Sequence, residues 1–249
     1  MKIAITGYGK MGQATEQLAI ENGHNVVSTI DPAMKTAKFK KLTEENLCEA
    51  DVVIDFTVPA IVLENIDIYI KYGINAVIGT TGWYEYLEEV KKKVEKSKIG
   101  LIWSGNFSIG VNLFFRIIKE SSELMNNFTL YDVMGYEIHH NRKKDSPSGT
   151  MNMIGKILLD NLKNKKKIVT EKLSRKIAED EIHLASIRGG SIPGTHVITF
   201  DSEVDTIELK HTARNRKGLA VGAIKAAEWI KDKKGFYNIE DMMKEIIGG

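Results

Sequence analysis

The chain has 249 residues, enough for one large or two small compact domains with a substantial core. Lys and Arg number 35 against 33 Asp and Glu, and this net charge of +2 gives no reason to expect a nucleic acid or a membrane surface as a partner. A single cysteine, Cys48, rules out an internal disulfide framework, and no apolar run approaches the roughly 20 residues that cross a bilayer. Met1 leads into "KIAIT" without the pattern of a leader peptide. We therefore expect a cytoplasmic protein with small-molecule partners.

The first hundred residues predict a parallel sheet covered by helices. Five short β-branched runs are apolar on both faces, as buried parallel strands are: 2–6, 25–30, 51–57, 75–81 and 99–104. Between the first two runs, Met11, Ala14 and Leu18 share one face of a predicted helix. This alternation predicts an α/β fold with a Rossmann-type doubly wound sheet over residues 1–106.

A G-x-G-x-x-G motif, "GYGKMG", follows the first predicted strand and opens the first predicted helix. Gly7 permits the tight turn, Gly9 lets a pyrophosphate approach the backbone, and Gly12 lets the helix pack closely on the strand. Asp31 ends the second predicted strand, where a carboxylate can accept hydrogen bonds from a ribose. The context favours dinucleotide binding over the alternative of a glycine-rich turn without a ligand.

Asp31 also bears on the choice of cofactor. Its charge repels the extra phosphate of NADPH, and no arginine follows it directly. We therefore predict that NADH is preferred and keep NADPH as the alternative, since Lys10, Lys35 and Lys38 are close in sequence and weaken the argument.

Two further turns follow the fourth and fifth predicted strands: "GTTG" at 79–82 and "SGNF" at 104–107. Ligands of open α/β sheets lie beyond the carboxyl ends of the strands, so these turns are expected to line the nicotinamide side of a crevice. Ordinary polar connections are the alternative interpretation.

The pattern changes after residue 107, where elements no longer alternate. The predicted elements are a helix over 108–126, a strand over 129–140, a helix over 150–162, a solvated loop over the charge run 163–167, a hairpin of 195–200 with 205–211, and a helix from 217. Segregated strands and helices predict a second, α+β domain over 107–216. The residues alone do not decide which of the two domains the segment 217–249 packs on.

The stretch "EIHHNRKKDSPSGT" concentrates ionisable residues between two apolar segments. Ser148 is a predicted N-cap, and a helix start of this kind offers free backbone donors to a carboxylate. Lys143 adds positive charge, and His139 or His140 can deliver a proton near neutral pH. With a hydride donor upstream, these features predict reduction of a small anionic, unsaturated substrate.

Two alternatives compete for this stretch. The histidines and lysines can be solvated surface, or His139, His140 and Asp145 can ligate a metal ion. Adjacent histidines in a strand point to opposite faces and the lysines oppose a cation, so no metal is predicted.

The motifs "GYGKMG", "DFTVPA", "IGTTGW", "SGNFSIGVNLFF", "EIHHNRKKDSPSGT" and "ELKHTARNR" occur in this order along most of the chain. In these motifs the sequence resembles the 4-hydroxy-tetrahydrodipicolinate reductase family, also called dihydrodipicolinate reductase, of bacterial and plant lysine biosynthesis. The resemblance implies reduction of a cyclic dicarboxylate with loss of water. It implies His139 as the proton donor, Lys143 as its assistant, and His140, Gly149 and Thr150 as residues that hold the substrate carboxylates.

The same resemblance implies the cofactor contacts, which are Gly7, Tyr8, Gly9, Lys10, Met11, Gly12, Asp31, Gly79, Thr80, Thr81, Ser104, Gly105, Asn106 and Phe107. It also implies that segment 217–249 returns to the Rossmann domain, that the central domain forms a homotetramer, and that the two domains close over ligands.

Some features depart from the family pattern. The glycine loop is one residue shorter than in many members, Lys10 stands where an arginine is common, and the stretch before Arg188 is abbreviated. Two other functions stay open: a related dehydrogenase acting on an aspartate-derived substrate, and a redox-sensing NADH-binding module whose central domain serves assembly only. A general dehydrogenase has no need of the histidine-rich stretch, and a sensor would bind the cofactor without turnover.

Overall fold

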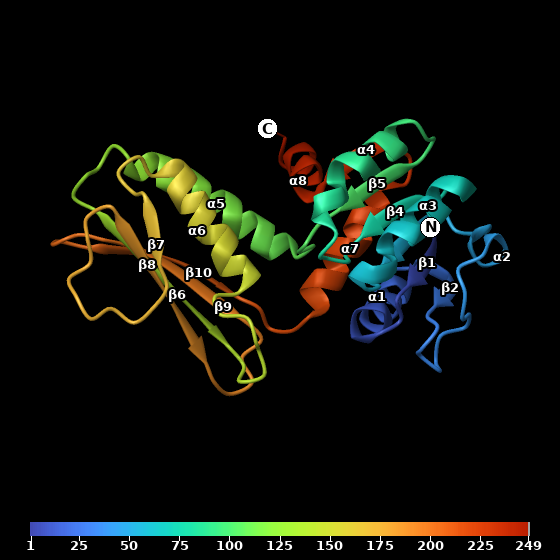
Figure 1. The fold of residues 1–249 in the computed structure, drawn as a ribbon, viewed down its shortest axis with the longest axis horizontal. Coiled ribbons are helices and arrows are strands. Elements are labelled where there is room, and N and C mark those ends of the chain that lie inside the picture. Colours follow the sequence, from blue (N-terminus) through green and yellow to red (C-terminus); the bar gives the residue numbers. More distant parts are fainter. Residues whose placement is uncertain (249) are drawn as a thin grey trace. The chain divides into compact units, whose positions relative to one another are not determined.

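The computed structural model describes residues 1–248 (Figure 1). The chain forms two compact units: Met1–Asn112 together with the segment from Arg216 onward, and Leu113–Asn215. In the described chain, no helix combines the length and the apolar character that crossing a membrane requires.

The first unit is built on a sheet whose six strands all run parallel, in the order β11-β5-β4-β3-β1-β2. The strands are β1 (Lys2–Thr6), β2 (Asn25–Ile30), β3 (Val52–Asp55), β4 (Asn75–Ile78), β5 (Gly100–Trp103) and β11 (Gly235–Asn238). The other elements are α1 (Lys10–Glu21), α2 (Glu44–Leu47), α3 (Pro59–Tyr72), the 3-10 turn η1 (Tyr84–Tyr86), α4 (Leu87–Glu95), α7 (Lys217–Ile230) and α8 (Ile239–Ile247).

Helices cover both faces of this sheet. Along β3, Val52 and Ile54 join a core cluster with Ala223 of α7, whereas Val53 joins a second cluster with Ile66 of α3. Residues that alternate along a strand point to opposite faces, so both faces are buried. The predicted α/β, doubly wound Rossmann-type fold is confirmed.

The C-terminal segment contains more than the expected helix. α7 ends at Ile230, and the chain then adds β11 to the edge of the sheet beside β5, with Gly235 opposite Gly100. Asn238 caps α8 through a capping box with Asp241. A strand of four residues carries too little hydrophobic periodicity to stand out in the sequence.

The second unit holds a mixed sheet in the order β10-β9-β6-β8-β7. Its strands are β6 (Asp132–His139), β7 (Lys167–Val169), β8 (Glu181–Arg188), β9 (Thr195–Asp201) and β10 (Thr206–Thr212). Its helices are α5 (Ile109–Met125), which begins in the first unit, and α6 (Gly149–Asn161). β9 and β10 pair antiparallel, which confirms the predicted hairpin, and β8 lies parallel to β6.

The two faces of the second sheet differ. Figure 1 shows α5 and α6 along one face, where Ile118 and Ile154 pack with Leu184 of the sheet. On the opposite face, Met134 and Ile187 each keep 50% of their surface exposed. The second sheet therefore has one covered face and one partly apolar face that is open in the single chain.

The prediction of a solvated loop over 163–167 is wrong for part of that run. Lys165 is only 7% exposed, and its Nζ donates to Asp132 Oδ1 at 2.5 Å and to the carbonyl oxygens of Glu179 at 2.7 Å and Glu181 at 3.2 Å. Lys167 already begins β7. A lysine can be buried when acceptors surround its ammonium group, and all three of these acceptors come from residues more than a dozen positions away.

Candidate active site

The glycine motif forms the turn between β1 and α1. Gly7 has φ +82°, and a Cβ there would lie 2.4 Å from the carbonyl oxygen of Phe56. A Cβ at Gly12 would lie 2.3 Å from the carbonyl oxygen of Gly7, whereas one at Gly9 would meet nothing within 4 Å. Gly9 is also the N-cap of α1 and provides no side-chain cap. Open space beside uncapped helix N–H groups fits a pyrophosphate.

Asp31 follows β2 directly and lies beside this turn. Its Oδ2 accepts a hydrogen bond from the Tyr8 N–H at 2.8 Å, and its Oδ1 accepts from the N–H groups of Ala33 at 2.8 Å and Met34 at 3.0 Å. Burial acts to raise the pKa of the Asp31 carboxyl, but these N–H donors and the Lys40 ammonium outweigh it and lower the pKa. An ionised carboxylate has about four acceptor positions, so one remains for a ribose hydroxyl.

The remaining residues of the glycine motif differ in exposure. Tyr8 is buried, and its hydroxyl donates to Glu16. The pKa of Tyr8 is raised to about 12, mainly by burial and secondly by this hydrogen bond. Lys10 is exposed at the first position of α1, and Met11 is half-buried against the core of the first unit.

Asp55 is a site residue that the sequence analysis missed. It ends β3 with no exposed surface. Its Oδ1 accepts from the hydroxyls of Thr57 at 2.6 Å and Thr80 at 2.9 Å, and its Oδ2 accepts from Asn65 Nδ2 at 3.0 Å and the Tyr69 hydroxyl at 2.8 Å. Asp55 thereby ties the turns after β3 and β4 together. An acidic residue at the end of the run "VVID" was the available signal.

The two predicted turns lie at the carboxyl ends of β4 and β5. A Cβ at Gly79 would come within 2.3 Å of the Phe56 ring, so this turn packs closely on its neighbour. Thr80 is buried and Thr81 is exposed. The second turn is closed by its own side chain, because Ser104 Oγ accepts from the Asn106 N–H at 3.0 Å. Its remaining two residues lie in contrasting surroundings, with Gly105 exposed and Phe107 buried.

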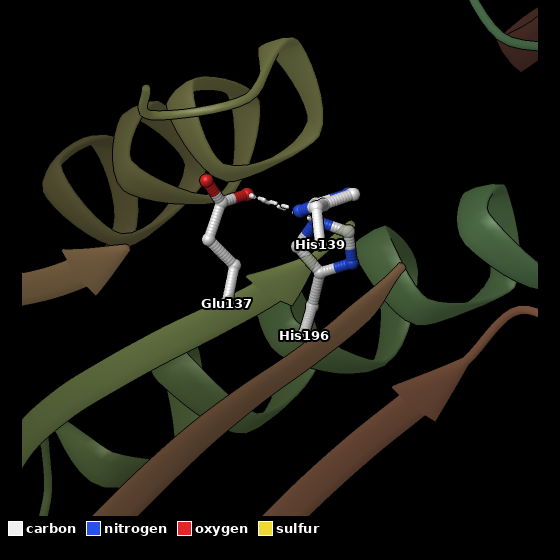
Figure 2. Close-up of side chains that lie close together, drawn as sticks. All are labelled: Glu137, His139 and His196. Carbon is white, nitrogen blue, oxygen red and sulfur yellow. Dashed lines mark ion pairs between the residues drawn. The ribbon is translucent and has the colours of Figure 1, made fainter. Parts of the chain in front are cut away.

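In the second unit, three side chains from two strands converge (Figure 2). Glu137 and His139 alternate along β6 and so share a face, and His196 of β9 is paired with Glu137. Glu137 Oε2 lies 3.5 Å from Nδ1 of His139 and 3.4 Å from Nε2 of His196. All three side chains are buried. We call these three residues the Glu137 cluster.

Glu137 is held by donors from three segments. Its Oε1 accepts from Arg188 Nη2 at 2.6 Å, the Ser186 hydroxyl at 2.9 Å and the Ser148 N–H at 2.9 Å, and its Oε2 accepts from the Ser148 hydroxyl. Burial acts to raise the pKa of Glu137, but hydrogen bonds from His196, Ser148 and Arg188 outweigh it and hold the pKa well below its usual range. Glu137 is therefore ionised at neutral pH.

His139 stands in a mixed electrostatic environment. Burial is the largest cause that lowers the pKa of His139, to about 4; Glu137 acts to raise it, and His196, Lys143 and Arg188 act to lower it further. The ligand-free chain thus holds a neutral imidazole at pH 7. A bound anion beside the ring would raise this pKa again.

The loop after β6 leads to the start of α6, which is the predicted carboxylate-binding site, called the anion seat below. Ser148 caps α6 by accepting from the Met151 N–H at 3.1 Å, and a Cβ at Gly149 would meet nothing within 4 Å. Thr150 follows in the half-exposed first turn of α6. The predicted N-cap is confirmed, and the backbone at Gly149 is accessible to a ligand.

The other predicted residues of this loop are placed differently. Lys143 pairs with Asp145 at 2.9 Å and is close enough to His139 to affect its pKa. The His140 N–H donates to the Ile192 carbonyl oxygen at 2.9 Å, and its buried Nδ1 has no hydrogen-bond partner within residues 1–248. The structure therefore brings Lys143 near His139, whereas it shows no comparable interaction between His140 and His139 among residues 1–248.

The Glu137 cluster also has the composition of a metal site, because one potential ligand atom from each residue lies within 4.8 Å of the others. This set differs from the His139, His140 and Asp145 set considered from sequence. Arg188 already binds Glu137, and it acts with Lys143 as a positive charge on His139. Two neighbouring cations oppose a metal ion, so we interpret the cluster as a hydrogen-bonding and proton-transfer site.

Comparisons with known proteins give consistent matches along the chain. The family model for the N-terminus of dihydrodipicolinate reductase matches residues 1–107, and the model for its C-terminus matches residues 110–243. The chain is 37% identical to the 4-hydroxy-tetrahydrodipicolinate reductase of Christiangramia forsetii over 247 residues, covering 99% of both chains. It is 36% identical to the enzyme of that name from Thermosipho africanus, covering 98% of this chain and 99% of the relative.

A solved structure is also similar. The dipicolinate-bound dihydrodipicolinate reductase of Paenisporosarcina sp. TG-14 superposes with a TM-score of 0.78 at 27% identity, covering 97% of this chain and 98% of that one.

Gly9 provides a test of the dinucleotide seat. Because a Cβ at Gly9 would meet nothing within 4 Å, Gly9→Val should leave the melting temperature nearly unchanged but weaken NADH binding at least about tenfold, by filling the space for the pyrophosphate. Fluorescence titration of NADH and a thermal melt measure both effects.

Gly12→Ala is the contrasting variant, since its Cβ would approach the Gly7 carbonyl oxygen and should lower the melting temperature. Unchanged NADH affinity in Gly9→Val would contradict the placement of the pyrophosphate.

Proposed function

The chain belongs to the dihydrodipicolinate reductase family, and from this premise we infer that it reduces 4-hydroxy-tetrahydrodipicolinate to tetrahydrodipicolinate with loss of water. The observation that carries the inference is the match to both family models, which together cover the chain from residue 1 to 243 with only two residues between them. The reaction belongs to the diaminopimelate route to L-lysine. It is an NAD(P)H-dependent reduction.

The first unit is the proposed dinucleotide-binding domain, completed by the segment from residue 217. When bound, NAD(P)H supplies the hydride. The backbone from Gly7 to Gly12 would hold the pyrophosphate, because Gly9 leaves open space beside uncapped N–H groups. Asp31 would bind the adenosine ribose through its remaining acceptor position, and the turns Gly79–Thr81 and Ser104–Phe107 would contact the rest of the cofactor.

The second unit is the proposed substrate-binding domain. The uncovered backbone at Gly149 and the first turn of α6 up to Thr150 would receive a substrate carboxylate, with Lys143 and His140 assisting. The substrate would be a small cyclic dicarboxylate, and the similarity to a dipicolinate-bound reductase supports that class.

His139 is the proposed proton donor. In the ligand-free chain the low pKa of His139 keeps its imidazole neutral near pH 7. A substrate with two carboxylates would bring negative charge to the site, raise this pKa and so favour uptake of a proton. The imidazolium formed in this way would protonate the substrate when the hydride arrives.

Homotetramer formation through the second sheet is a further proposal. The face opposite α5 and α6 exposes half of Met134 and half of Ile187, and the strand register places Ile187 beside Ile138 on that face. Apolar side chains on an open sheet face are typical of a protein interface. The cytoplasmic location stays a prediction from composition.

A coupled assay with freshly prepared substrate tests activity and cofactor choice together. We expect oxidation of both cofactors, with kcat/KM about tenfold higher for NADH because the ionised Asp31 repels the phosphate of NADPH. Asp31→Asn should reduce the difference in kcat/KM between NADH and NADPH. A tenfold preference for NADPH would contradict the argument from Asp31, and cofactor binding without turnover would favour a sensor.

Replacing His139 tests the proton donor. His139→Gln should lower kcat about a hundredfold to ten-thousandfold, the usual range for loss of a general acid, while NADH affinity stays unchanged. Lys143→Ala should lower kcat and raise KM. Lys144→Ala changes an exposed lysine beside it and serves as the control. Wild-type kinetics in both His139→Gln and Lys143→Ala would refute the assigned roles.

Charge on the open sheet face tests the oligomer. Wild-type protein should have the mass of four chains by light scattering, and Ile187→Glu should give smaller species because a charge cannot be buried unpaired in an interface. Val204→Glu is the control, since Val204 is 81% exposed in the β9–β10 turn. A monomeric wild type would contradict the proposal.

A further inference from the structure

The neutral imidazole of His139 can carry its proton on either ring nitrogen, and the two nitrogens face different surroundings. Nδ1 is buried, forms no hydrogen bond within residues 1–248, and lies 3.5 Å from Glu137 Oε2. Nε2 lies against Gly194, where a Cβ would come within 2.9 Å of it. At 3.5 Å the Nδ1 contact is slightly longer than a hydrogen bond, as contacts in ligand-free active sites often are.

The carboxylate of Glu137 cannot turn freely. Oε1 accepts from three donors, the Arg188 guanidinium, the Ser186 hydroxyl and the Ser148 N–H. Oε2 is the oxygen that faces the rings of His139 and His196. Because Arg188 and the Ser148 N–H are donors in every state, Oε1 keeps its place and Oε2 always presents an acceptor to the histidines.

The charged groups around His139 come from several elements. Glu137 lies on the same strand, His196 on β9, Arg188 on β8, and Lys143 on the loop after β6. Glu137 is the one acidic group among these neighbours. It alone among them offers the ring an ionised acceptor.

We propose that Glu137 is a positioning residue that keeps the Nδ1 proton on His139 and leaves Nε2 as the nitrogen that transfers a proton to the substrate. The inference rests on the proposed role of His139. In the transfer, the Nε2–H bond of the imidazolium breaks, its electron pair stays on the ring, and the proton goes to the substrate. The ring that remains is the neutral Nδ1–H tautomer, whose proton faces Glu137 Oε2.

The same carboxylate also orients the anion seat. Ser148 donates to Glu137 through both its N–H and its hydroxyl, and its Oγ accepts from the Met151 N–H as the N-cap of α6. One buried group therefore fixes the imidazole and the start of the helix that would hold the substrate carboxylate. A small change at Glu137 should disturb both.

Glu137→Gln gives a sharp prediction for the tautomer. The glutamine oxygen takes the place of Oε1, since Arg188 and the Ser148 N–H can only donate to it. The amide NH₂ group then stands where Oε2 was and donates toward Nδ1 of His139. Nδ1 must become an acceptor, so the ring proton should move to Nε2.

Nitrogen NMR of histidine-labelled, ligand-free protein near neutral pH measures the tautomer directly. The chain has 6 histidines, and the His139 signals are identified by their loss in His139→Asn. We expect the Nδ1–H form in the wild type, the Nε2–H form in Glu137→Gln, and a fall in kcat of at least about tenfold in that variant.

Glu181→Gln is the matched control. Glu181 is also a buried glutamate of the second sheet paired with an arginine, Arg175, at 2.7 Å. It begins β8, whereas Arg188, the β8 residue paired with His139, ends that strand. This variant should keep the Nδ1–H form of His139 and a kcat close to that of the wild type.

Three results would overturn the inference. The first is an Nε2–H tautomer of His139 in the wild type. This measurement does not depend on whether any variant folds. The second is a folded Glu137→Gln protein that keeps the Nδ1–H form, and the third is an inverted tautomer with unchanged kcat. Full turnover in His139→Gln would instead show that the proposed proton donor is wrong, a result separable from the tautomer because the tautomer is measured without substrate.

Discussion

A buried carboxylate must be surrounded by donors, and the second unit is arranged around this requirement at Glu137. The side chain has no exposed surface, and its donors come from β8, the start of α6 and β9. Removing such a charge from water is costly unless hydrogen bonds replace the hydration. The donors that meet this cost are also the groups that flank the proposed acid and the proposed anion seat.

The first unit follows the same principle with a different residue. Asp55 is fully buried at the end of β3 and gathers hydroxyl and amide donors from the turns after β3 and β4 and from α3. In open parallel sheets ligands bind beyond the carboxyl ends of the strands. Each unit thus uses one buried carboxylate to fix the polypeptide around a proposed ligand site, with Asp55 near the dinucleotide turn and Glu137 near the histidines.

Local patterns in the sequence were sufficient to predict much of the fold. Five of the six strands of the first sheet, the glycine turn at Gly7–Gly12, the hairpin of β9 and β10, and the N-cap at Ser148 each depend on neighbouring residues, and the structure contains all of them. The family resemblance rested on such motifs as well. It is confirmed by matches to both halves of the family.

Features that depend on distant residues were not predicted. Glu137 and Arg188 are 51 positions apart, and His196 reaches the cluster only through strand pairing. The burial of Lys165 likewise depends on Asp132 and Glu179. Composition alone makes such residues look solvated, because the acceptors and donors that allow burial are brought together only by the fold.

His139 is proposed to be neutral until a dianion binds and then to take up a proton. Isothermal titration calorimetry of dipicolinate binding near pH 7, repeated in buffers of different ionisation enthalpy, counts the protons exchanged. We expect net proton uptake by the wild type, because binding raises the pKa of His139 from about 4, and loss of that uptake in His139→Gln. Equal proton uptake in the two proteins, or none in the wild type, would contradict it.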